Sequence, residues 1–209
     1  MPLRRRQAFH VIKFIRFFTW WVTGMQSAIY LGNHEALTTI SRPSVIEEAI
    51  PMNAIDLLKA DHEKVKGILA QLSGSTDRAT KKRTELLEKL EMEITIHTQL
   101  EEQILYPAYK EAGGKKQDEM YYEAKEEHRT VDSLVLPDLK TTDPSTPEFA
   151  GRVKVVKELL EHHIEEEETE MFPQAKKLLG KEKLDELGKE MEAMKASLKK
   201  SLGSPNIAA

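Results

Sequence analysis

Two copies of a short motif, a histidine followed four residues later by a glutamate, combine residue types that bind metal ions. They are His97-x-x-x-Glu101 and His163-x-x-x-Glu167. Residues four apart lie on one face of a helix, so each motif would present an imidazole and a carboxylate together. The chain contains no cysteine. A metal would therefore be held by nitrogen and oxygen ligands alone, which favours iron, manganese or zinc.

The motifs belong to an internal repeat with an offset of 66 residues, which also relates His62 to His128 and Pro107 to Pro173. Two helical hairpins related by duplication would close into a bundle with approximate two-fold symmetry. Its core would hold four imidazoles and two carboxylates, a set that suits two metal ions bridged by the carboxylates. The candidate metal ligands are His62, His97, Glu101, His128, His163 and Glu167.

Four amphipathic helices are predicted to position these side chains. They run from Asn53, an N-cap, to Gly74; from about Asp77 to Ala112, bent near Pro107; from Lys116 to Leu139; and from Thr146 to about Leu179. No alternating, β-branched strand pattern is present. We predict an all-α fold, an antiparallel up-down four-helix bundle over residues 52–180. Residues 181–209 form an extra, charged C-terminal helix and tail, with the helix either packed on the outside or free.

Each predicted helix places a histidine on its apolar stripe. One buried neutral histidine with a hydrogen-bond partner needs no metal, so a metal-free helical scaffold is an alternative. Burying unpaired carboxylates costs several kcal/mol, however, and a metal centre offsets that cost. His162 is expected at the surface or just behind the ligands, and within the run Glu165–Glu168 only Glu167 has the inward phase. Asp61 and Glu127 are expected at the surface, with orientation of ligands as the alternative.

The element His-x-x-x-Glu-x-x-x-x-[Tyr/Phe]-Pro, present twice, resembles the hemerythrin-like, or HHE cation-binding, proteins. The resemblance covers Asn53 to about Gly180. It implies a four-helix bundle with two non-haem iron ions, bridging carboxylates at Glu101 and Glu167, and the four histidines as terminal ligands. Members carry or sense O2, or handle iron or nitric oxide. Oxygen carriers have a further histidine where this chain has Asp132, a difference that affects O2 carriage more than metal binding.

The expected function is therefore that of a non-haem di-iron protein that binds or senses O2 or handles iron. An enzyme acting on peroxide or nitric oxide at the same site is an alternative. The sequence offers no acid–base pair beyond the ligands, which favours a binding module over an enzyme. The expected partner is a small molecule such as O2, with no nucleic acid.

Residues 1–51 form a basic and apolar leader and linker. They carry six basic and three acidic residues, a net charge of +3, whereas the remaining 25 basic and 32 acidic residues sum to −7. The uncharged run from Phe17 to Leu31 has 15 residues, short of the ~20 that span a bilayer. A targeting peptide, contact with a membrane, and a leader without a role are all open. A cytoplasmic location is expected for the domain.

Overall fold

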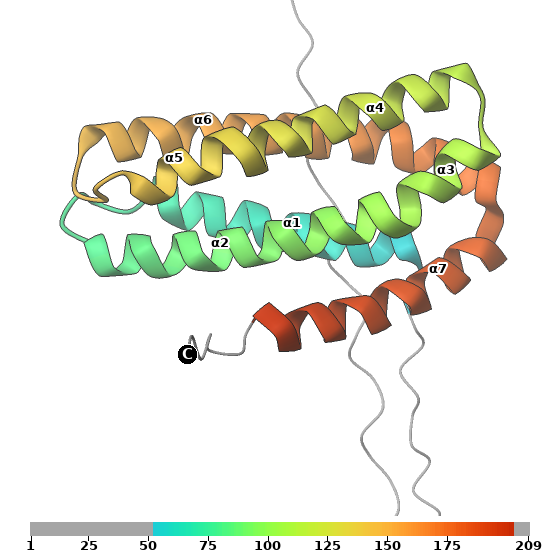
Figure 1. The fold of residues 1–209 in the computed structure, drawn as a ribbon, viewed down its shortest axis with the longest axis horizontal. Coiled ribbons are helices and arrows are strands. Elements are labelled where there is room, and N and C mark those ends of the chain that lie inside the picture. Colours follow the sequence, from blue (N-terminus) through green and yellow to red (C-terminus); the bar gives the residue numbers. More distant parts are fainter. Residues whose placement is uncertain (1–51, 203–209) are drawn as a thin grey trace, which may run out of the picture. The chain divides into compact units, whose positions relative to one another are not determined.

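The structure is a computed structural model that describes residues 52–202, in which helices are joined by short turns and no β-strand is present. Four antiparallel rods form a bundle, and a fifth helix runs along one side of it (Figure 1). The predicted all-α fold is confirmed. The elements are α1 (Ala54–Ser73), α2 (Thr80–Leu100), η1 (Glu101–Leu105), α3 (Tyr106–Ala112), α4 (Lys115–Thr130), η2 (Val131–Val135), α5 (Leu136–Thr141), α6 (Pro147–Glu166), η3 (Glu167–Met171) and α7 (Phe172–Leu202), where η marks a π-helical segment. The first rod is α1, the second is α2–η1–α3, the third is α4–η2–α5, and the fourth is α6–η3 with the start of α7.

Two helices begin at the N-cap residues that the sequence analysis named. The Asn53 side chain accepts from the backbone N–H of Asp56, and Thr146 accepts from that of Phe149. Both are the N-cap interactions expected of these residue types. The second rod begins at Thr80 rather than at Asp77. Its predicted start was wrong because residues 76–79 form a tight turn, in which the N–H of Ala79 donates to the carbonyl of Thr76.

Three prolines that would break a regular helix are each preceded by a π-helical segment. η1, η2 and η3 end one residue before Tyr106-Pro107, Leu136-Pro137 and Phe172-Pro173. In η1 the N–H of Tyr106 donates to the carbonyl of Glu101, five residues earlier. The wider turn lets the chain pass the proline, which lacks an N–H and clashes with the preceding helical turn. Each of these three helices therefore continues past its proline, including Pro107, where a bend was predicted.

The predicted stop at Gly180 marks a sharp turn inside α7. Gly180 has φ 71°, in the left-handed region that glycine adopts without strain. The helix after it packs along α1 and α2, on the opposite side of the bundle from α4 in Figure 1. At Gly188 a Cβ would lie 2.2 Å from the carbonyl oxygen of Met52. Only a glycine permits this close approach, so α7 is fitted to the start of α1.

The apolar core forms two clusters, one towards each end of the bundle. One joins the start of α1, η1 and α7, and the other joins the end of α1 with α2, η2 and α6. On α1, for example, Leu58 belongs to the first cluster and Val65 to the second, with His62 between them. The predicted ligands thus lie in a polar layer between two apolar layers.

An ion pair ties α7 to α1 and supports a first prediction. Lys195 donates to both oxygens of Asp61, whose residue is 5% exposed, against the prediction that it lies at the surface. Lys195→Met is expected to lower the free energy of unfolding by about 2 to 3 kcal/mol, because Asp61 would stay buried without a partner. Lys189→Met, at an exposed position of the same helix, is the matched control. Urea titration measures both.

The double variant Asp61→Leu/Lys195→Met separates a structural ion pair from simple packing. Replacing both partners removes the unpaired charge, so most of the lost stability should return. If the double variant is less stable than Lys195→Met alone, the ion pair is not the cause of the loss.

No helix within residues 52–202 is long and apolar enough to cross a membrane. The predicted leader lies outside the described residues, as do His10 and His34. Its targeting or membrane role, and the cytoplasmic location of the domain, stay predictions.

Candidate metal centre

All six predicted ligands meet in the polar layer of the bundle, each at most 7% exposed. Their donor atoms fall into two groups, in each of which the atoms lie within 4.8 Å of one another. The first group contains His62, His97, Glu101 and Glu167, and the second contains Glu101, His128 and His163. Four rods contribute, so the centre exists only in the folded bundle.

The first group is compact enough for its atoms to face a single ion. The Nε2 atoms of His62 and His97 are 3.1 Å apart. His97 Nε2 lies 3.2 Å from Glu101 Oε1, and His62 Nε2 lies 3.2 Å from Glu167 Oε2. Two ligand atoms each about 2.1 Å from one ion, at angles of 90 to 109°, are about 3.0 to 3.4 Å apart. These distances fit that spacing.

The second group mirrors the first. The Nε2 atoms of His128 and His163 are also 3.1 Å apart. The two ring pairs, His62–His97 and His128–His163, share a centroid distance of 4.7 Å and an angle of 65°. Glu101 reaches this group through its other oxygen, which lies 3.4 Å from His128 Nε2. Glu101 therefore contacts both groups.

Glu167 also contacts both groups, because its Oε2 lies 3.6 Å from His163 Nε2 as well as near His62. Three buried polar atoms have no hydrogen-bond partner among the described residues: His97 Nδ1, Glu101 Oε1 and Glu167 Oε2. Unsatisfied buried carboxylate oxygens are costly unless a cation neutralises them. The donor set and these unpartnered oxygens both fit a pair of metal ions.

Three glutamates outside the predicted set fix the orientation of three imidazoles. Glu168 lies 2.9 Å from His62 Nδ1, and Glu102 lies 3.1 Å from His128 Nδ1. Glu127 lies 2.7 Å from the Nδ1 of His163. An acceptor on Nδ1 leaves Nε2 free to bind a metal and makes it more basic. Glu127 therefore has the orienting role that was the weaker prediction, and Glu168 is not simply a solvated side chain.

His97 lacks this support. The counterpart of Glu127 at an offset of 66 residues is Asp61. Asp61 is occupied by Lys195, and the Nδ1 of His97 has no hydrogen-bond partner. The two groups, alike in their inner geometry, therefore differ in their outer contacts.

Tyr106, which was not among the predicted ligands, contacts the centre through its hydroxyl. Its hydroxyl donates to Glu167 Oε1 over 2.7 Å, and it lies 3.4 Å from Glu101 Oε2 and 3.5 Å from His128 Nε2. Its ring stacks on His128 at 5.6 Å, as that of Phe172 stacks on His62. The phenol oxygen is thus a further possible donor, present in only one half of the centre.

The charges of the centre shift the pKa values of its members in the absence of a metal. Burial opposes protonation of His128, but hydrogen bonds to Glu101 and Glu102 outweigh it and raise its pKa to about 10. Burial opposes ionisation of Glu101, but the charges of His97 and His128 and their hydrogen bonds hold its pKa well below the usual value. Burial, reinforced by Glu101 and Glu167, raises the pKa of Tyr106 well above its usual value. In the metal-free centre an imidazolium at His128 therefore faces the carboxylate of Glu101.

Asp132 lies apart from both groups of donor atoms. It lines a cavity of about 20 Å³ together with all four histidines. The rest of that lining is mainly aliphatic: Val65, Ile94, Val131, Leu160 and Ile164. Burial raises the pKa of the Asp132 carboxyl. His162 is exposed, as predicted, and forms a third possible cation-binding group with Glu127 and Glu166.

Comparisons with known proteins agree with this geometry. Residues 53–175 match the family described as Hemerythrin HHE cation binding domain. A crystal structure of a Hemerythrin HHE cation binding domain-containing protein from Mycobacterium kansasii, an Rv2633c homolog, superposes with a TM-score of 0.63. That protein is 30% identical, with 72% of this chain and 89% of that one covered.

Two relatives known by sequence differ in how much of their length is matched. Uncharacterized protein Rv2633c of Mycobacterium tuberculosis is 31% identical over 156 residues, which cover 74% of this chain and 90% of the relative. A DNA nickase of Nostoc sp. is 28% identical over 152 residues, 73% of this chain. The match spans only 42% of the nickase, so more than half of that protein lies outside it.

Proposed function

The chain belongs to the hemerythrin HHE cation-binding domain family, and on that premise we propose that it is a non-haem di-iron protein that binds O2 or a related small ligand. The observation that carries the proposal is the pair of buried donor groups, which share Glu101 and contain only imidazole and carboxylate donors. Such donors without sulfur suit iron. Glu101 and Glu167 would bridge the two ions, and the four histidines would be their terminal ligands.

The cavity beside the histidines supports a ligand of two or three atoms. Its volume of about 20 Å³ is close to the space that one water molecule occupies. Its lining beyond the histidines is mainly aliphatic, which suits an uncharged ligand such as O2 better than a polar substrate. Sensing of O2 and handling of iron remain compatible uses of the same centre.

The chain's own residues prepare the centre in three ways. Glu168, Glu102 and Glu127 accept from Nδ1 of three histidines and keep each Nε2 directed inward. The two apolar clusters exclude water from both ends of the layer. Tyr106 keeps the proton on its hydroxyl, because burial raises its pKa, and donates a hydrogen bond to Glu167 Oε1. The iron pair, when bound, would supply reversible electron transfer to the small ligand.

Metal analysis tests the proposal directly. The purified chain, reconstituted anaerobically with Fe²⁺ and desalted, is expected to hold two irons. On exposure to O2 it should gain near-ultraviolet absorption from oxygen-to-iron charge transfer. Less than one iron per chain after reconstitution would overturn the proposal and favour a metal-free scaffold, in which His62→Leu should stabilise the fold.

An enzyme acting on peroxide or nitric oxide is a second candidate, favoured by two titratable groups near the donor atoms. These are the phenol of Tyr106 and the carboxyl of Asp132, whose pKa values are both raised, chiefly by burial. Sustained turnover of either compound, lost in His97→Ala, would establish this candidate. Stable binding without turnover favours the first.

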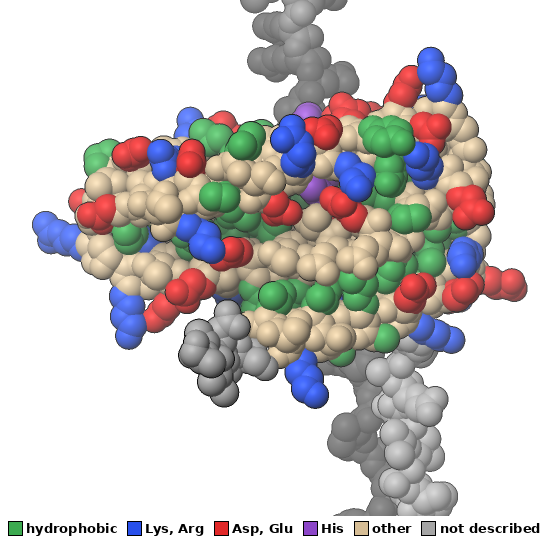
Figure 2. Space-filling view, viewed as in Figure 1, with side chains coloured by type: hydrophobic (Ala, Val, Ile, Leu, Met, Phe, Trp, Pro, Cys, Tyr) green, Lys and Arg blue, Asp and Glu red, His purple; other side chains and the backbone are tan. Residues whose placement is uncertain are grey.

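Nicking of DNA is disfavoured for this chain. The face in Figure 2 carries acidic and basic side chains side by side, without a continuous basic patch. Residues 52–209 have a net charge of −7, from 25 basic and 32 acidic residues. A phosphate backbone is bound mainly through clustered basic side chains.

A further inference from the structure

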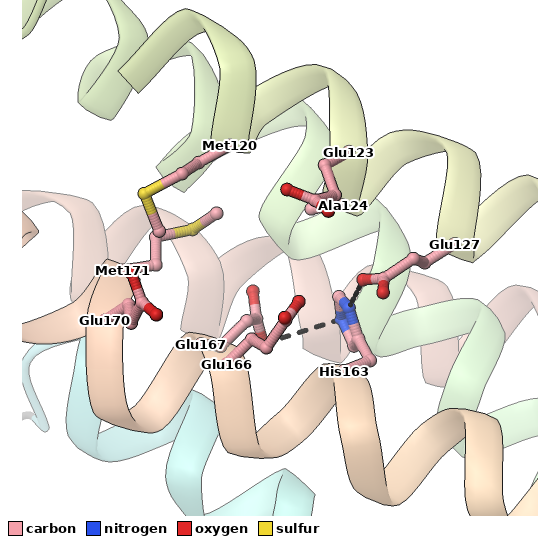
Figure 3. A pocket seen from close by; sticks show the side chains of 9 residues that line it. All are labelled: Met120, Glu123, Ala124, Glu127, His163, Glu166, Glu167, Glu170 and Met171. Atoms are coloured by element: carbon pink, nitrogen blue, oxygen red, sulfur yellow. Dashed lines mark hydrogen bonds and ion pairs between the residues drawn. The ribbon is translucent and has the colours of Figure 1, made fainter. Parts of the chain in front are cut away.

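A pocket between α4 and the η3 segment connects the candidate centre with the surface. It has a volume of about 80 Å³, and none of its nine lining residues is a lysine or an arginine. Lys116 pairs with one of them, Glu170, over 3.6 Å. Figure 3 shows acidic side chains from both elements around one space, with Met120 and Met171 at one end. The carboxylates at its mouth belong to Glu123, Glu166 and Glu170.

The floor of this pocket is the candidate centre itself. His163 and Glu167, both buried, line it. The Oε2 atom of Glu167 has no hydrogen-bond partner, and the residue is only 2% exposed. The contacts of this oxygen are with imidazoles, His62 Nε2 at 3.2 Å and His163 Nε2 at 3.6 Å. Five carboxylates line the pocket and its floor, and this surplus of negative charge favours a cation.

In the other half of the bundle, apolar side chains fill the positions that correspond to this pocket. The residues 66 positions before Met120, Glu123, Ala124, Glu166, Glu170 and Met171 are Ala54, Leu57, Leu58, Leu100, Ile104 and Leu105. All six are buried and apolar, and they pack in one cluster with Leu184, Leu187 and Met191 of α7. The C-terminal helix therefore covers the corresponding face.

The third group of possible cation ligands lies at the rim of the pocket. Glu127, His162 and Glu166 offer ligand atoms within 4.8 Å of one another. Glu127 and Glu166 also line the pocket, and Glu127 contacts His163 at its floor (Figure 3). The group therefore joins the solvent-exposed His162 to the buried donors by a continuous path of carboxylates.

From these observations we propose that divalent metal ions reach the centre through the acidic pocket between α4 and η3, and that Glu127, His162 and Glu166 bind the ion in passing. The proposal rests on the function proposed above. Glu123, Glu166 and Glu170 attract the hydrated cation, and Glu167 draws it inward. α7 closes the opposite side, so loading proceeds from one face only.

Uptake kinetics test the route separately from binding itself. Co²⁺, which gains visible absorption when bound by nitrogen and oxygen ligands, is mixed with the metal-free full chain in a stopped-flow spectrometer. The variant Glu123→Gln/Glu166→Gln/Glu170→Gln is expected to load about tenfold more slowly at low ionic strength. Its final Co²⁺ content should equal that of the unmodified chain. The difference should shrink with added salt, because salt screens exposed carboxylates.

Matched controls identify the cause of any slowing. Glu85→Gln/Glu88→Gln/Glu182→Gln removes the same charge from exposed positions outside the pocket, and should load at the unmodified rate. Glu166→Leu places at the mouth the residue type found at the closed position Leu100, and should slow loading further. His162→Gln should slow it about threefold if the rim group binds the ion in passing.

Two results would overturn the route. One is equal loading rates for the pocket variant and the unmodified chain, and the other is equal slowing in the control triple variant. In both cases full final loading would leave the proposed function standing. Absence of Co²⁺ and Fe²⁺ binding in the unmodified chain would instead reject the proposed function.

Discussion

The Glu101→Gln chain is expected to bind neither of the two iron ions with measurable affinity at micromolar concentrations. Among residues 52–202, Glu101 is the one residue that belongs to both groups of donor atoms. Its Oε1 lies 3.2 Å from His97 Nε2 and its Oε2 lies 3.4 Å from His128 Nε2. Loss of a residue that hydrogen-bonds to a ligand typically lowers metal affinity about 10- to 100-fold. Loss of the shared, charged ligand itself should lower the affinity further.

Two substitutions at nearby positions serve as comparisons for the iron affinity of Glu101→Gln. Glu102→Gln removes the charged acceptor for His128 Nδ1 and the partner of Lys125, but no metal ligand. Two irons should therefore still bind, about 10- to 100-fold more weakly. Glu165→Gln changes an exposed side chain and should bind like the unmodified chain. Competition with a coloured chelator measures all three affinities. Two irons held by Glu101→Gln at unmodified affinity would exclude Glu101 as a shared ligand.

Helical periodicity was sufficient to predict which side chains meet in the centre. His97 and Glu101 share a face of α2 and η1, as His163 and Glu167 share one of α6 and η3, because residues four apart stay aligned. The stripes of apolar residues around His62 also predicted its burial. Both inferences depend only on local helical geometry, which these segments follow closely.

Tyr106 was missed because the helix around it is not regular. It is nine residues after His97, and nine steps of about 100° place it on the opposite face of an α-helix. The extra residue of η1 removes about 100° of rotation, which brings Tyr106 close to the direction of Glu101. The proline that follows was the available signal, because it required a local distortion of the rod.

The docking of α7 could not be predicted from its own charge pattern. Its buried side chains are few, and its fit depends on Gly188 against the backbone of Met52 and on Lys195 against Asp61. Such contacts join positions more than 100 residues apart. Glu102 and Glu168 were missed for a related reason, since each contacts a histidine on a different rod.

The second large effect is expected in the pH dependence of stability, which should have opposite slopes for the metal-free and the iron-loaded chain. In the metal-free chain the pKa of His128 is raised from 6.5 to about 10, since hydrogen bonds to Glu101 and Glu102 outweigh burial. A group with a raised folded-state pKa stabilises fully below its unfolded value and loses that contribution as the pH rises through the folded value. The metal-free chain should therefore lose stability between about pH 6.5 and 10.

The lowered pKa of Glu101 acts at the other end of the scale. Its contribution is present above the unfolded value of 4.5 and disappears as the pH falls through the lowered folded value. The metal-free chain should therefore be most stable between about pH 4.5 and 6.5. From there to pH 9 the free energy of unfolding should fall by about 2 to 4 kcal/mol, since each unit of pKa shift corresponds to 1.36 kcal/mol.

Iron binding reverses this trend, because a histidine must lose its proton before it binds a metal. As the pH rises, fewer protons compete for the four imidazoles, so the difference in unfolding free energy between loaded and metal-free chains should widen. Urea titrations at pH 6, 7.5 and 9 measure both forms. His162→Gln, at an exposed histidine, should leave both slopes unchanged, whereas His128→Gln should flatten the slope of the metal-free chain. Parallel slopes for the two forms would contradict exchange of protons for metal in this layer.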